Sequence, residues 1–250
     1  MNIIYQSSNI RVAEFLDADG DMQRQLFFGP DFLSCQGALK TSRPLYQLHE
    51  FTRHLTYAAF TPAVPLVRIL FLGLGAGIAI HATEKFFPSA HVDIVDYNRE
   101  LFEISHKYFF DLEQPGFSLI SDDAATFILQ STSTYDLICC DIWGPSLETP
   151  TFLRNADFYD AVRARLREGG SFAINISANE HKRVSEMLAH RFLSTISLRG
   201  NNAFFISSDQ PRIEPHMAPP KDTLATYNID VEAITNASIS IRSREPSSFD

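Results

Sequence analysis

The chain has 250 residues, of which 45% are hydrophobic and 12% aromatic, and its formal net charge is −9 at pH 7. This composition predicts one sizeable buried core and argues against an intrinsically disordered chain. The acidic charge argues against nucleic acid as a partner, because phosphate backbones are bound by clustered lysines and arginines.

Other sequence features argue against a membrane or metal protein. The start, MNIIYQSSNIRVAEF, has no basic segment followed by a long apolar one, so we expect no signal peptide. The most apolar stretch, 69–80, is too short to span a bilayer and contains three glycines, so we expect no membrane partner. The histidines form no HExxH motif and pair with no CxxC, so we expect no metal.

Residues 1–56 predict a small antiparallel β unit. Short β-like runs at 10–15 and 25–28 are separated by residues typical of turns. From 46 to 60 apolar residues recur at helical spacing, and Pro62 and Pro65 follow this segment.

A repeating β–α pattern then begins and predicts the main domain. Apolar strands are expected at 67–72, 92–95, 117–120, 137–140 and 171–176, and helices at 76–87, 99–110, 122–130 and 158–167. Alternating units with right-handed crossovers predict an α/β fold with a doubly wound, mostly parallel sheet. We assign this domain to residues 57–250, with a loosely ordered C-terminal tail.

The strongest motif is LFLGLGAG at 70–77, where Gly73, Gly75 and Gly77 follow a strand and open a helix. In a nucleotide-binding turn the first glycine makes the tight turn, the second lets a ligand approach the backbone, and the third lets helix and strand pack closely. The spacing GxGxG, unlike GxGxxG, favours an adenosyl ligand over a dinucleotide. It therefore makes residues 57–250 a candidate adenosyl-binding domain, Rossmann-like and of the class I methyltransferase type. A turn that serves packing alone is the alternative.

Acidic residues end the strands that follow. Asp96 lies where a carboxylate can accept both hydroxyl hydrogens of a ribose. Of Asp122 and Asp123, one can bind the exocyclic amine of adenine while the other caps a helix. Asp141 ends the fourth strand and is the candidate catalytic acid or base, and Trp143 is a candidate wall of the acceptor site. Each aspartate alone also fits a cap or a turn, whereas together they form a negative rim suited to a sulfonium donor.

From about residue 10 to 239 the order of these features resembles the polyamine aminopropyltransferases, the spermidine synthase family. LFFGPDFLSCQ places Gln36 where the family has a glutamine that contacts the donor. Leu48-His49-Glu50 resembles the family's tyrosine-histidine-glutamate, LFEISHKYF resembles its next helix, and Tyr227-Asn228 resembles a pair near its end.

The resemblance implies roles for individual residues. It assigns the ribose to Asp96, an adenine contact to Asp123-Ala124, and removal of a proton from the attacking amine to Asp141. It makes His49 and Glu50 candidate substrate residues, together with Trp143. It also implies a homodimer, a cytoplasmic location and no metal.

Three positions depart from the family's pattern. Ala76 stands where the family has an aspartate thought to hold the donor's amine. Gly144 replaces a second aspartate after the catalytic one, and Leu48 replaces the tyrosine before the histidine.

The leading hypothesis is therefore a spermidine-synthase-like transferase that moves an aminopropyl group from decarboxylated S-adenosylmethionine to a small amine acceptor. The first alternative is a methyltransferase that uses ordinary S-adenosylmethionine on a small molecule. The second is a catalytically inactive adenosyl-binding homologue.

Overall fold

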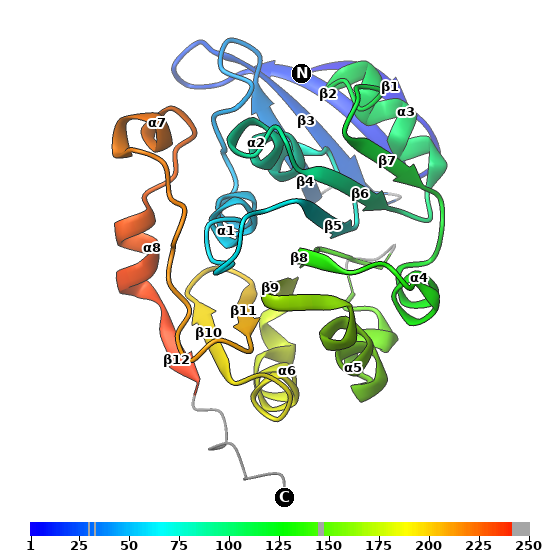
Figure 1. Cartoon of the computed structure of the whole chain (residues 1–250). Helices are drawn as coiled ribbons and strands as arrows, with labels where there is room; N and C mark the ends of the chain where they lie inside the picture. The colour runs from blue at the N-terminus through cyan, green and yellow to red at the C-terminus, as the bar shows by residue number, and fades with distance from the viewer. Residues whose placement is uncertain (30, 33, 145–147, 242–250) are drawn as a thin grey trace, which may run out of the picture.

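The computed structural model describes residues 1–29, 31–32, 34–144 and 148–241. A four-stranded sheet near the N-terminus and an eight-stranded sheet form its framework (Figure 1). The fold class predicted from the sequence is confirmed: the main sheet is mostly parallel, with helices on both faces, and the N-terminal unit is antiparallel.

The N-terminal sheet has the order β1-β2-β3-β4. Its strands are β1 (Asn2–Gln6), β2 (Ile10–Leu16), β3 (Met22–Phe28) and β4 (Ser34–Lys40). Val12, Leu26 and Leu39 are buried in one core cluster with residues of the main domain. The sequence indicated parts of β2 and β3 only, because β1 and β4 carry polar residues that interrupt an apolar alternation.

The main sheet has the order β12-β10-β11-β9-β8-β5-β6-β7. Its parallel strands are β5 (Arg68–Leu72), β6 (His91–Val95), β7 (Phe117–Ile120), β8 (Tyr135–Cys140) and β9 (Leu166–Ile176). The antiparallel strands are β10 (Ser194–Leu198), β11 (Ala203–Ser208) and β12 (Ile239–Ile241). No element was predicted from the sequence in the segment that contains β10 and β11.

Helices cover both faces of this sheet, α1 to α3 on one side and α4 to α6 on the other (Figure 1). Their bounds are α1 (Glu50–Ala58), α2 (Ile78–Phe86), α3 (Arg99–Tyr108), α4 (Ala124–Gln130), α5 (Ala156–Arg165) and α6 (His181–Ala189). Short 3-10 helices span Thr151–Arg154 and Ala178–Glu180. Within the described ranges, no helix has the length and apolar character needed to cross a bilayer.

α1 contacts α2 and β9, so it packs with the main sheet. The division expected between residues 56 and 57 falls inside this helix, and we propose placing it ahead of α1 instead.

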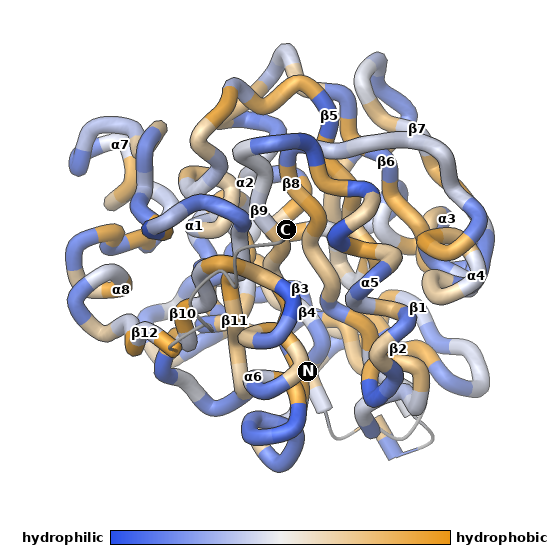
Figure 2. Tube along the Cα trace, turned by 60° about the horizontal axis from the view of Figure 1, so that its bottom comes forward, coloured by the Kyte–Doolittle hydropathy of each residue, from blue (hydrophilic) through white to orange (hydrophobic). Residues whose placement is uncertain are grey.

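The core consists mainly of the central strands. Every residue of β8 is buried, as are Ile69 to Leu72 in β5. Hydrophobic colour gathers on the central strands and hydrophilic colour on the outer loops (Figure 2). Strands buried on both faces need continuous apolar runs, which is why the sequence predicted them well.

The C-terminal part is more ordered than the sequence analysis expected. Residues 221–241 form α7 (Lys221–Thr226), α8 (Val231–Ala237) and β12, and β12 pairs with β10. Leu224 and Ile229 are buried in a cluster with Phe60. Tertiary packing orders these short elements, so no local sequence pattern predicted them. The end of the expected tail, 242–250, lies outside the described residues.

The order of the strands creates a crevice at the centre of the main sheet. β5 and β8 are neighbours, and the chain continues from β5 towards β6 and from β8 towards β9, on opposite sides. Ligands of open α/β sheets bind beyond the carboxyl ends of two such strands. Gly73 follows β5 and Asp141 follows β8, so the fold brings these two residues to one place.

The contact between the N-terminal sheet and the turn after β5 can be tested at Gly37. A Cβ added there would lie 2.4 Å from Ala76 Cβ, so Gly37→Ala forces the two backbones apart. We expect this change to lower the free energy of unfolding by about 1–3 kcal/mol, measured by urea denaturation. Adding Ala76→Gly removes the overlap, so the double variant should be more stable than Gly37→Ala alone. Wild-type stability of the single variant would contradict the close packing.

Candidate functional site

The glycine turn connects β5 to α2 and requires left-handed backbone. The φ angles are 98° at Gly73, 54° at Gly75 and 74° at Gly77, a region that other residues rarely adopt. A Cβ on Gly73 would lie 2.3 Å from the carbonyl oxygen of Asp141, so the turn packs directly on the end of β8. A Cβ on Gly77 would lie 3.0 Å from Ser105 Oγ in α3, so this glycine serves helix packing.

Asp96 follows β6 and is hydrogen-bonded to the backbone of the glycine turn. Its Oδ2 accepts a hydrogen bond from Leu74 N at 2.9 Å, and its Oδ1 accepts one from Asn98 N at 2.9 Å. Burial raises the pKa of Asp96, and these two backbone donors oppose the rise. Each carboxylate oxygen can accept a further hydrogen bond, so Asp96 keeps capacity for a ligand.

Asp122 and Asp123 differ in position. Asp123 lines the central cavity and caps α4, since its Oδ1 accepts from Thr126 N at 2.9 Å. Asp122 Oδ1 accepts from Asp123 N at 2.8 Å, and Asp122 is not among the lining residues. Asp123 therefore both caps the helix and lies at the cavity, whereas the sequence predicted one of these features for each aspartate.

Asp141 lies at the carboxyl end of β8, where its backbone N donates to Leu72 O at 2.9 Å. Its Oδ1 accepts hydrogen bonds from Trp143 Nε1 and from Asn175 Nδ2, each at 2.9 Å. Burial raises the pKa of Asp141, and the bonds from Asn175 and Trp143 partly offset this. Trp143 is thus bonded to the candidate catalytic carboxylate as well as lining the cavity.

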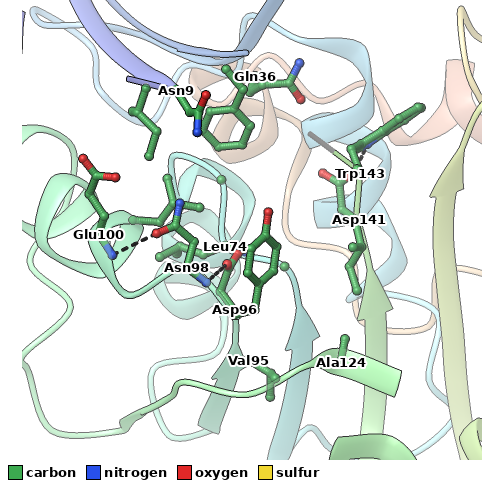
Figure 3. A pocket seen from close by; sticks show the side chains of 18 of the residues that line it. Asn9, Gln36, Leu74, Val95, Asp96, Asn98, Glu100, Ala124, Asp141 and Trp143 are labelled. Atoms are coloured by element: carbon green, nitrogen blue, oxygen red, sulfur yellow. Dashed lines mark hydrogen bonds between the residues drawn. The ribbon is translucent and has the colours of Figure 1, made fainter. Parts of the chain in front are cut away.

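A cavity of about 440 Å³ joins these features. Figure 3 shows Asp96 and Asp141 reaching it from the main sheet, with Asn9 and Gln36 on the wall opposite. The cavity brings together seven of the candidate binding and catalytic residues identified from the sequence: Gln36, Gly73, Gly75, Asp96, Asp123, Asp141 and Trp143. Its size falls within the range of small-molecule sites.

His49 and Glu50 lie apart from this cavity. They line a smaller one, of about 80 Å³, with His54 and Asn175. Glu50 Oε2 accepts from Asn201 N at 3.0 Å, and burial lowers the pKa of His49. Because Asn175 also donates to Asp141, the two cavities adjoin at this side chain.

Other lining residues were not singled out in the sequence. Tyr97 and Asn98 come directly after Asp96 in the sequence, and this position could have identified them as lining residues. Glu100 looks like an ordinary acidic residue in the first turn of α3, and the Tyr5 hydroxyl in β1 donates to it. Asn9 lies in the turn between β1 and β2, and no sequence pattern marks it.

The charges around the cavity have one sign. Its charged lining residues are Asp96, Glu100, Asp123 and Asp141, and among the described residues that line it there is no lysine, arginine or histidine. Such a surface favours cationic ligands. In the described part of the chain, no group of three or more histidine, cysteine or acidic residues is arranged to hold a metal.

The structure accounts for two of the three departures from the family's pattern. Ala76 is 3% exposed and packs against Gly37, so its side chain does not reach the cavity. A Cβ on Gly144 would lie 2.1 Å from Glu148 Oε1, so the Glu148 carboxylate occupies the space of a side chain at position 144. Leu48 is not among the residues that line the central cavity.

The fold and the glycine turn define an α/β protein of the Rossmann-like, methyltransferase-type class. Residues 49–203 match the family model described as spermine/spermidine synthase domain, which is well over half of the chain. The chain therefore belongs to the spermine/spermidine synthase family.

Curated relatives carry the name polyamine aminopropyltransferase. The one from Saccharolobus islandicus (strain Y.N.15.51 / Yellowstone #2) is 27% identical over 138 residues, 52% of this chain and 46% of the relative. The one from Pectobacterium carotovorum subsp. carotovorum (strain PC1) is 26% identical over 140 residues, 53% of this chain and 46% of the relative. The matched part thus spans slightly under half the length of these relatives.

Solved structures show the same fold. A probable spermidine synthase from Corynebacterium glutamicum ATCC 13032 aligns with a TM-score of 0.73 at 17% identity, covering 96% of this chain and 90% of that one. Spermidine synthase from Thermotoga maritima aligns with a TM-score of 0.65 at 16% identity, covering 96% and 84%. Human methyltransferase-like protein 13 in complex with SAH aligns with a TM-score of 0.54 at 19% identity, covering 79% and 92%. At these identities the likeness concerns the fold alone.

The contact between the glycine turn and β8 can be tested with two glycine variants. Gly73→Ala combines an unfavourable φ with an overlap against Asp141, whereas Gly20→Ala has a similar φ of 81° and no atom within 4 Å. We expect both to lose stability from backbone strain, and Gly73→Ala to lose about 2 kcal/mol more, measured by urea denaturation. Equal losses would show that the contact at Gly73 contributes nothing.

Proposed function

We propose that this chain transfers an aminopropyl group from decarboxylated S-adenosylmethionine to an amine acceptor. The observation that carries the proposal is a single cavity in which a glycine turn meets side chains whose charges are all negative. Membership of the spermine/spermidine synthase family supports it, as do relatives named polyamine aminopropyltransferase.

In the proposed complex the donor's adenosine lies along the glycine turn. Gly75 has only one atom within 4 Å of an added Cβ, Gln36 O at 3.8 Å, so a ligand can approach its backbone closely. Asp96 accepts hydrogen bonds from the ribose hydroxyls through the lone pairs that Leu74 N and Asn98 N leave open. Asp123 accepts one from the exocyclic amine of adenine, and Gln36 contacts the donor from β4.

The charge of the cavity favours the decarboxylated donor. Decarboxylated S-adenosylmethionine carries a sulfonium and an ammonium, whereas the ordinary donor adds a carboxylate. Among the described lining residues no basic side chain can pair with that carboxylate, and four acidic ones repel it. With Ala76 buried, we assign the donor's ammonium to the carboxylates that do line the cavity.

Asp141 is proposed as the base. An amine acceptor is protonated at neutral pH and needs a free lone pair to attack. Asp141 accepts one proton from it, the nitrogen bonds to the carbon next to the sulfonium, and the carbon–sulfur bond breaks to leave a neutral thioether. Burial makes Asp141 a stronger base, because it raises the pKa of the carboxyl.

We place the acceptor on the side of Asp141 that carries Trp143. Glu148, whose carboxylate lies against Gly144, adds negative charge there. His49 and Glu50 line the adjoining small cavity and are proposed to contact the acceptor's far end. The homodimer and the cytoplasmic location stay predictions.

Asp141→Asn tests the base directly. The amide cannot accept the proton, so we expect turnover to fall about 10²- to 10⁴-fold while the affinity for the donor changes only a few-fold. Asp160→Asn is the matched control, because Asp160 pairs with Arg191 and does not line the cavity. Wild-type turnover in Asp141→Asn would remove Asp141 from the mechanism.

Calorimetry with three ligands tests the donor. We expect decarboxylated S-adenosylmethionine to bind at least about tenfold more tightly than the ordinary donor, a difference of about 1.4 kcal/mol. Methylthioadenosine, which lacks the charged tail, shows how much the tail contributes. Tighter binding of the ordinary donor would favour the methyltransferase alternative, and formation of an aminopropylated amine would exclude an inactive homologue.

A further inference from the structure

Asn175 holds a position that neither the sequence analysis nor the reaction above assigns. It lies in β9 beside the end of β8, and it is 1% exposed. Its Nδ2 donates to Asp141 Oδ1 at 2.9 Å. The Trp143 indole donates to the same oxygen from the loop after β8, also at 2.9 Å. Two donors on separate parts of the backbone therefore converge on one carboxylate oxygen.

This convergence has a geometric consequence. With Oδ1 held by two donors, the carboxylate cannot rotate freely about χ2. Asp141 lines the central cavity (Figure 3), and neither of these two hydrogen bonds ends on Oδ2, so Oδ2 is the oxygen open to a ligand. Proton transfer requires the accepting oxygen within hydrogen-bond reach of the reacting amine. Asn175 and Trp143 thereby determine which oxygen meets the acceptor.

It also has an electrostatic consequence, because hydrogen bonds to a carboxylate favour its ionised form. The other titratable groups nearby do not supply that stabilisation. Those that share the cavity or its rim are Asp96, Tyr97, Glu100, Asp123 and Glu148. Those on the same strand are the buried thiols of Cys139 and Cys140, and those beyond Asn175 are His49, Glu50 and His54. Burial lowers the pKa of both histidines, to about 4 for His54, so neither is a cation at neutral pH.

We propose that Asn175 is a positioning residue, which together with Trp143 fixes the Asp141 carboxylate in its ionised form with Oδ2 facing the acceptor. The meaning of this arrangement for catalysis rests on the proposed function. The arrangement itself is a property of the folded chain and is measurable without any substrate.

The test follows protonation of Asp141 by infrared difference spectroscopy. The carbonyl band of the protonated carboxyl is isolated by subtracting the spectrum of the same protein carrying Asp141→Asn, and its intensity is recorded against pH. Asn175→Leu removes the hydrogen bond that Asn175 donates to Asp141. We expect the midpoint of the Asp141 titration to rise by about one pH unit in this variant. In Asn175→Asp, which keeps the shape of the side chain, a second carboxyl competes for the proton and the midpoint should rise further.

Thr195→Val is the control for the loss of a buried polar group. Thr195 Oγ1 lies 2.9 Å from Ser207 Oγ in the same sheet and does not line the cavity, so the midpoint should stay at its wild-type value. Turnover should fall on acidification when Asp141 becomes protonated. In the Asn175 variants the pH of this fall should rise by the same amount as the midpoint of the Asp141 titration, because a carboxyl with a raised pKa ionises only at higher pH. A merely structural role would move stability and leave both quantities unchanged.

An unchanged midpoint in both Asn175 variants would overturn the inference, whether or not the chain transfers an aminopropyl group. A shifted midpoint in a chain that transfers nothing, even as wild type, would leave the positioning of Asp141 intact and overturn the proposed function instead.

Discussion

The site depends on one close approach, between Gly73 and the backbone of Asp141. A side chain at position 73 would overlap the Asp141 carbonyl, so the glycine turn and the end of β8 are in direct contact. Asp96 holds the turn from the other side through Leu74 N. The glycine turn and the candidate base are therefore set relative to each other by the centre of the sheet, which is the most rigid part of such a fold.

The parts of this arrangement that the sequence predicted share a physical origin. Central parallel strands are buried on both faces, so β5 and β8 appear as unbroken apolar runs. Residues at the ends of such strands reach the crevice, so Gly73, Asp96 and Asp141 were identified by position and chemistry together. Local sequence patterns were enough to identify these residues, because in such a fold the carboxyl ends of the central strands form the crevice.

Other parts depend on contacts that local patterns do not encode. Asn175 lies within a buried strand and is polar among apolar neighbours, and its partner Asp141 is distant in sequence. Asn9 lines the cavity only because the N-terminal sheet packs over the main domain. His49 and Glu50, taken from the family resemblance, line a neighbouring cavity. The order of residues 221–241 likewise comes from tertiary packing.

Acidic residues around one cavity repel one another, and the doubly cationic donor that we propose would offset that repulsion. A crystal structure of the chain with bound decarboxylated S-adenosylmethionine tests this account most directly. It should show adenosine between Asp96 and Asp123, with the carbon beside the sulfonium turned towards the Asp141 side of the cavity. A donor bound elsewhere, or one bound there with its reactive carbon turned away from Asp141, would contradict it.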